Sequence, residues 1–158
     1  MASAARRLMI CMDGSEEADK AFEWYLNHFY KESDYVNILY CAEHGVLQAA
    51  PVPAGDPSLI SKLANEEEGY IIRLLKNFQS KLVEAKKIYP NIKGTVQRVT
   101  GKKPGEQIVT QAQKHHVDLI IMGSRGLGTI RRTIMGSVSQ YVVHYARVPV
   151  MVIRNEES

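Results

Sequence analysis

Short apolar runs alternate with helix-like stretches along the whole chain, and this alternation restricts the fold more than any other feature of the sequence. The run Val117–Met122 is nearly all apolar, as is typical of a parallel strand covered on both faces. The apolar residues of Ala18–Leu26 instead recur every three or four positions, which predicts a helix with one buried face. Strands and helices in alternation predict a doubly wound α/β sandwich, with helices on both faces of a parallel sheet. The expected strands are Arg7–Met12, Tyr35–Ala42, Gly94–Thr100, Val117–Met122 and Val148–Ile153, and the expected helices begin near Ser15, Ser58, Pro104 and Gly136.

The chain is expected to form a single domain over residues 1–158. This length is enough to bury a core without disulfides or metals, and the hydrophobic share of 45% is ordinary for a globular protein. The segment His44–Pro57 contains three prolines and two glycines and is expected to be an extended loop. The helix expected over Ser58–Tyr89 has its apolar residues on one side, at Leu63, Tyr70, Leu74, Phe78, Leu82 and Ala85.

Charge, hydropathy and cysteine content argue against several classes of partner. The net charge of +3 is too small to indicate nucleic-acid binding. No apolar stretch approaches the roughly 20 residues that a membrane-spanning helix needs, and Leu8–Met12 is too short for a secretory signal. Cys11 and Cys41, the only cysteines, lie inside apolar runs, which indicates small buried residues in a reducing compartment. We therefore expect a cytoplasmic protein with no metal site of its own and no nucleic-acid or membrane partner.

A glycine-rich segment follows the run Val117–Met122. It begins with Gly123-Ser124-Arg125-Gly126, and after nine further residues Gly136-Ser137 opens a helix-like stretch. A buried strand, a glycine loop and a helix N-terminus in this order make an anion pocket, because glycines allow close approach and the helix start offers unpaired N–H groups. A Walker-type loop is excluded because no Lys-Ser/Thr pair follows the glycines, and a Rossmann fingerprint is absent from the first strand–helix turn. The segment predicts a polyphosphate site.

These motifs resemble those of the universal stress protein family. The stretches that carry the resemblance are Leu8–Glu16, Ile121–Gly128, Met135–Ser139 and Val148–Ile153. The match is to the ATP-binding branch of the family, whose signature is G-x-x-G, nine residues and then G-S/T. From His44 to about Pro90 only the helical pattern matches. The resemblance implies a three-layer doubly wound sandwich with a five-stranded parallel sheet in the order 3-2-1-4-5.

The candidate site residues follow from the residues and the resemblance together. Asp13, at a strand end, could accept a hydrogen bond from ribose or adenine or hold Mg²⁺ between phosphates, or it could satisfy local N–H groups of its turn. The resemblance implies that Asp13 contacts the nucleoside and that the backbone at the end of the second strand, best assigned to Cys41, receives the adenine. Ser137 could also be the N-cap of its helix. The expected phosphate contacts are Gly123, Arg125, Gly126, Gly136, Ser137, Val138 and Ser139.

The resemblance implies a stress-response protein that binds ATP or AMP, with Mg²⁺ when ATP is bound, and that acts as a sensor or regulator. No catalytic residue is expected, since the adjacent His115 and His116 point apart on a helix and no general base stands out. Two alternatives stay open: a slow Mg-dependent ATPase or adenylating enzyme on the same fold, and a dimeric interaction module with a vestigial pocket.

The last apolar run predicts how the chain assembles. Val148–Ile153 is apolar on both faces, and in the order 3-2-1-4-5 it lies at the sheet edge. An uncovered edge strand invites pairing with another chain, so we expect a homodimer through this strand. The alternative is a monomer whose edge is shielded by the tail Arg154–Ser158.

Overall fold

The computed structural model describes residues 4–42, 57–124 and 136–154, and within them five strands and four helices alternate. All strand pairs are parallel and the order in the sheet is β3-β2-β1-β4-β5, which confirms the expected fold and strand order. The elements are β1 (Arg6–Cys11), α1 (Glu16–His28), β2 (Asp34–Ala42), α3 (Pro57–Ile88), β3 (Lys93–Thr100), α4 (Pro104–Lys114), β4 (Leu119–Gly123), α5 (Ser137–Tyr145) and β5 (Val150–Ile153).

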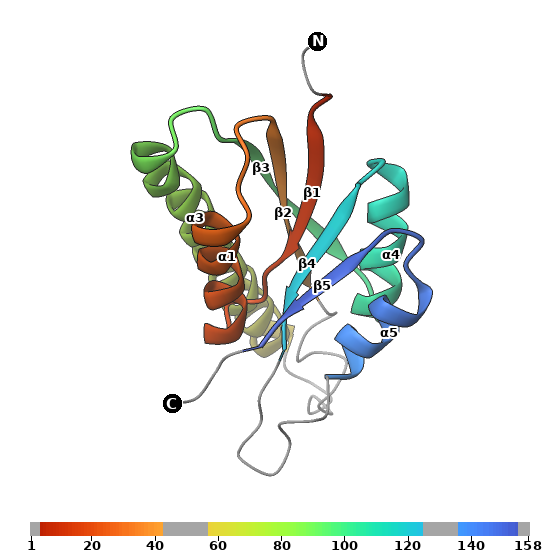
Figure 1. The fold of residues 1–158 in the computed structure, drawn as a ribbon. Helices are drawn as coiled ribbons and strands as arrows, with labels where there is room; N and C mark the ends of the chain where they lie inside the picture. The colour runs from red at the N-terminus through yellow and green to blue at the C-terminus, as the bar shows by residue number, and fades with distance from the viewer. Residues whose placement is uncertain (1–3, 43–56, 125–135, 155–158) are drawn as a thin grey trace.

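Different helix pairs cover the two faces of the sheet. Helices α1 and α3 lie on one face, and α4 and α5 lie on the other (Figure 1). Side chains along β1 alternate between the two resulting cores: Leu8, Ile10 and Met12 pack toward α1 and α3, whereas Met9 packs toward α4 and α5. This alternation follows from the two-residue period of a strand, and it explains why the central part of β1 and all of β4 are apolar.

The helix starts follow local sequence signals. Helix α1 begins after Ser15, whose hydroxyl accepts the N–H of Ala18 at 3.2 Å, and its first turn carries three acidic residues. Helix α4 has Pro104 in its first turn, where the missing N–H costs nothing. Within the described ranges, no helix is both long enough and apolar enough to cross a membrane.

The buried side of α3 differs from the expected one at a single position. Tyr70, expected to face the core, is 52% exposed, and the neighbouring Ile71 is 4% exposed instead. Ile71, Phe78, Leu82 and Ala85 form a stripe at spacings of seven, four and three residues, all compatible with one helix face. The sequence pattern allowed either residue at this turn, and the purely apolar side chain occupies the core.

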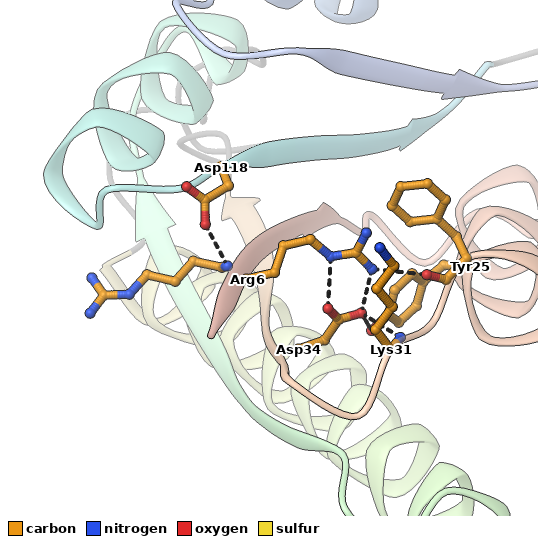
Figure 2. A network of polar contacts seen from close by, with 7 residues as sticks. Arg6, Tyr25, Lys31, Asp34 and Asp118 are labelled. Atoms are coloured by element: carbon orange, nitrogen blue, oxygen red, sulfur yellow. Dashed lines mark hydrogen bonds and ion pairs between the residues drawn. The ribbon is translucent and has the colours of Figure 1, made fainter. Parts of the chain in front are cut away.

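A network of hydrogen bonds surrounds the buried Asp34 at the amino edge of the sheet, where β1 and β2 begin (Figure 2). The side chain of Asp34 is fully buried, and its carboxylate accepts Nε and Nη2 of Arg6, both at 2.7 Å. The same carboxylate accepts the Tyr25 hydroxyl at 2.8 Å and the N–H of Lys31 at 2.9 Å. The Arg6 guanidinium also lies 4.4 Å from the ring centroid of Phe29. Burial and the bond to Asp34 raise the pKa of Tyr25. The network ties both strands to the end of α1.

Candidate functional site

The strand register brings three predicted regions together at the carboxyl edge of the sheet. Each residue of β1 pairs with the residue 28 positions later on β2, as in Arg6 with Asp34, so the same register places Asp13 level with Cys41. The pairing continues past β1, because Met12 N–H donates to the Leu39 carbonyl at 3.0 Å. The register of β1 with β4 similarly places Ser124 level with Asp13. This is the point where the strand order reverses, the usual place for a ligand in such a sheet.

Asp13 lies in a turn that is fixed by a hydrogen bond to Ser15 and by the packing of Gly14 against α3. Its Oδ1 accepts the N–H of Ser15 at 3.0 Å, so the local turn role that the sequence left open is present. Gly14 has a φ of +83°, and a Cβ there would lie 2.7 Å from Leu74 Cδ1 of α3. The half-buried Asp13 side chain therefore starts from a fixed backbone position, which favours a defined contact with a ligand.

Gly123 has a packing role that the sequence did not reveal. A Cβ at this position would lie 2.5 Å from the Glu17 carbonyl oxygen and 2.7 Å from its carbon, because the first turn of α1 passes directly over the end of β4. The next residue, Ser124, donates its N–H to the Ile153 carbonyl at 2.9 Å, so that donor is already used. The motif alone could not identify the element that passes over this glycine, because α1 lies more than 90 residues earlier in the chain.

The start of α5 differs in detail from the expectation. The N-cap is Gly136, with φ −59° and ψ 156°, and the exposed Ser137 is the first helical residue rather than the cap. No side chain of a described residue caps this helix start. Val138 packs against the core beneath α4 and α5, and Ser139 is buried at 5% exposure, so what these two residues can offer a ligand is mainly backbone N–H. An uncapped helix start with glycine at its tip suits an anion.

Cys41 is half-buried near the end of β2, and Cys11 is half-buried near the end of β1. Burial raises the pKa of Cys41 to about 11, so its thiol is neutral at physiological pH. Burial likewise raises the pKa of Cys11, with further contributions from Cys41 and Asp13. Both thiols are free, as expected. A neutral thiol is a weak nucleophile, which agrees with the prediction that Cys41 acts through its backbone.

Two polar groups beside this edge were missed by sequence reasoning. Arg98 on β3 forms a bidentate ion pair with Glu68 on α3, at 2.7 and 3.1 Å, and Tyr40 pairs with Arg98 across the strands. Arg98 and Glu68 are 30 positions apart in the sequence, so no local spacing signals the contact. The pair holds the first half of α3 against the sheet next to Cys41.

The two remaining predicted residues, Arg125 and Gly126, lie outside the described residues. In the part of the chain that the structure describes, no three His, Cys, Asp or Glu side chains gather as a metal site. A divalent cation would therefore need ligands from a bound phosphate, together with the Asp13 carboxylate. Among the described residues, the site therefore offers backbone donors at the start of α5 and the Asp13 carboxylate after the end of β1.

Known proteins share both the sequence pattern and the fold. A model described as the Universal stress protein family matches residues 4–154. Universal stress protein PHOS34 of Arabidopsis thaliana is 29% identical over 97% of this chain, which spans 63% of that protein. Universal stress protein YxiE of Bacillus subtilis is 24% identical over 94% of this chain and 98% of its own length.

Solved structures agree with the fold. Hypothetical protein MJ0577, from Methanocaldococcus jannaschii, gives a TM-score of 0.70 at 24% identity, covering 99% of this chain and 100% of that chain. A universal stress protein in complex with cAMP gives 0.64 at 18% identity, covering 96% and 98%. The Archaeoglobus fulgidus protein in complex with dAMP gives 0.52 at 18%, covering 97% and 99%. The structural likeness shows the shared fold, and the family match spans almost the whole chain: this protein belongs to the universal stress protein family.

Proposed function

We propose that this chain binds an adenine nucleotide, ATP or AMP, at the carboxyl edge of the sheet and acts in stress responses as a sensor or regulator. The observation that carries the proposal is the start of α5, which no side chain of the described residues caps and which follows β4 at the point where the strand order reverses. The complexes of two similarly folded proteins with cAMP and dAMP support an adenine nucleotide as the ligand class.

The parts of the nucleotide are assigned by position. The phosphates lie at the tip of α5, against Gly136 and the N–H groups of residues 137–139, where the helix dipole favours negative charge. The Asp13 carboxylate takes the ribose or adenine, and the backbone at Cys41 takes the adenine. With ATP, Mg²⁺ neutralises the phosphates. Arg125 and Gly126 complete the phosphate contacts.

Isothermal titration calorimetry with ATP and AMP tests the pocket. Wild-type protein should bind with a Kd in the micromolar range, and Gly136→Val should abolish detectable binding because a branched side chain occupies the phosphate position. Gly69→Val is the matched control, since a Cβ at Gly69 on α3 meets only Arg73 Nη1, at 3.4 Å. Circular dichroism checks that both variants fold. Unchanged ATP affinity in a folded Gly136→Val variant would remove the pocket from the proposal.

A regulatory role predicts slow turnover. We identify no general base among the described residues of the proposed site, so phosphate release from ATP should fall far below the roughly 1–10³ s⁻¹ of dedicated enzymes. A steady-state phosphate assay measures this rate. Turnover inside that range, lost in Asp13→Asn, would instead support the alternative of a metal-assisted ATPase.

A homodimer through β5 forms part of the proposal. Strand β5 lies at the end of the sheet order, and its four apolar residues are all only half-buried. Pairing with a second copy would cover them and satisfy the free strand edge. Light scattering at tens of micromolar should give twice the 17.8 kDa chain mass, and Val150→Pro should give a monomer. A wild-type monomer, or a dimer that survives the proline, rejects this interface.

A further inference from the structure

Strand β3 is the edge strand at the end of the sheet opposite β5, and no other strand of the described chain pairs with its outer side. The N–H of Gly101 donates to the Ala42 carbonyl at 3.1 Å, and in a parallel ladder alternate residues direct their backbone groups to the same neighbour. The odd-numbered residues of β3 therefore bond to β2. Gly94, Val96 and Arg98 direct their N–H and C=O groups away from the sheet.

Helix α3 follows β3 along most of the strand. Toward the carboxyl end of the strand, Glu68 of α3 forms its ion pair with Arg98 at 2.7 Å. Toward the amino end, a Cβ on Gly94 would lie 3.3 Å from Leu82 Cδ2 of α3. The side of the helix that carries Glu68 therefore borders the free edge of β3.

This side of α3 exposes apolar side chains. Ile72 lies about one turn after Glu68, and Val83 lies about three turns after Ile72, so the three residues share one side of the helix. The other side faces α1, where Lys81 pairs with Asp19 at 3.4 Å. Ile72 is 44% exposed and Val83 is 58% exposed. A further strand beside β3 would lie next to both side chains and cover them.

The same surface carries positive charge. Lys76 and Lys86 follow Ile72 and Val83 by about one turn, and Lys93 begins β3. All three lysines are exposed, and none forms an ion pair with a described residue. A second copy of this chain would bring these lysines against their own copies, and lysine on an edge strand opposes such self-pairing. The charge therefore favours an acidic segment of another protein.

We propose that the free edge of β3 and the exposed side of α3 form a docking surface for an extended, acidic segment of a partner protein. The segment adds a sixth strand to the sheet: its backbone pairs with Gly94, Val96 and Arg98, and every second side chain is apolar and packs toward Ile72 and Val83. Its carboxylates approach the three lysines. This inference does not rest on the proposed nucleotide site or on the proposed dimer, because β3 and β5 lie at opposite ends of the sheet.

Fluorescence anisotropy with a synthetic peptide tests the charge and the register of the partner. The probe is a labelled, end-blocked peptide of alternating glutamate and valine, matched in length to the 8 residues of β3. The control peptide replaces each glutamate by lysine. Wild-type protein should bind the glutamate peptide saturably and the lysine peptide at least about tenfold more weakly, because the lysines on the surface repel it.

Two matched substitutions on α3 test where the peptide lies. Val83→Glu places a negative charge on the proposed surface and removes an apolar contact, so the glutamate peptide should bind at least about tenfold more weakly. Ile88→Glu is the control: Ile88 is 73% exposed, and its position five residues after Val83 puts it on a different side of the helix. This variant should bind the peptide as wild type does.

Amide hydrogen exchange of wild-type protein tests the backbone pairing without any substitution. The outward amides of Gly94, Val96 and Arg98 should exchange fast in the free protein and become protected when the glutamate peptide is bound. The amides of Thr95 and Gln97, which bond to β2, should be protected throughout. Protection of the outward amides that instead rises with protein concentration alone would show a second copy at this edge and overturn the inference. It is also overturned if wild-type protein does not bind the glutamate peptide, if Val83→Glu and Ile88→Glu bind alike, or if the outward amides stay unprotected at saturation.

Discussion

The amino and carboxyl edges of the same sheet differ in how far their polar groups are hydrogen-bonded within the chain. At the amino edge, Asp34 is fully buried and accepts four hydrogen bonds from Arg6, Tyr25 and the backbone of Lys31. At the carboxyl edge, α5 starts at Gly136 with no side-chain cap in the described chain. The amino edge satisfies its buried charges within the chain, whereas no described side chain occupies the backbone donors at the start of α5.

This difference supports the proposal that the carboxyl edge binds a ligand while the amino edge contributes stability. Removing one partner of a buried ion pair strongly destabilises a protein, so substitutions at the amino edge should lower the free energy of unfolding. The glycine N-cap at Gly136 gives up only about a few tenths of a kcal/mol relative to a serine or asparagine cap, and local departures of this kind are typical of ligand sites. Substitutions at the two edges should therefore have different effects: unfolding at the amino edge, and loss of binding with little unfolding at the tip of α5.

The largest effect on stability is expected at Asp34. Asp34→Ala leaves the Arg6 guanidinium without its carboxylate in a partly buried place, so the free energy of unfolding should fall by about 3–5 kcal/mol. Urea unfolding followed by circular dichroism measures it. Glu16→Gln is the control, because the exposed Glu16–Lys20 pair at 2.9 Å should contribute less than about 1 kcal/mol. A loss below about 1 kcal/mol for Asp34→Ala would contradict the assignment of stability to this edge.

A smaller loss is expected at Gly123. In Gly123→Ala the new Cβ meets backbone atoms of Glu17 at 2.5 and 2.7 Å, so α1 must move and the free energy of unfolding should fall by about 1–3 kcal/mol. Gly69→Ala on α3 is the matched control and should stabilise by up to about 1 kcal/mol, because alanine favours a helix interior. Equal stability of the two variants in thermal and urea unfolding would show that α1 does not press on Gly123.

The smallest expected effect is on the reactivity of the Cys41 thiol. Its pKa of about 11 keeps the thiol neutral, so in Cys11→Ser protein the remaining thiol should react with Ellman's reagent at pH 8 at least about tenfold more slowly than in urea. Because the folded pKa is raised, the stabilisation from the neutral thiol is present below about pH 9 and is lost as the pH rises toward 11. Equal rates in the folded and unfolded chain would contradict the burial of Cys41.

Some of this arrangement could be predicted from the sequence. The apolar runs predict the central strands, because those strands are covered on both faces, and the glycine–serine pair at 136–137 predicts the start of α5. Contacts between distant residues could not be predicted. The approach of α1 to Gly123 and the pairing of Arg6 with Asp34 depend on tertiary packing, which short-range spacing does not encode. At Tyr70 and Ile71 the helical period permitted both residues, and only packing distinguished them.

The most direct test is backbone amide NMR during titration with AMP, because it reports separately on nucleotide binding at the carboxyl edge and on the amino edge, which should contribute stability only. We expect saturable chemical-shift changes for the amides of Asp13, Cys41 and residues 136–139, while the amides of Arg6, Lys31 and Asp34 stay unchanged. In Gly136→Val the same titration should leave the carboxyl edge unshifted. Chemical-shift changes confined to the amino edge, or no changes at millimolar AMP in folded wild-type protein, would contradict binding at the carboxyl edge.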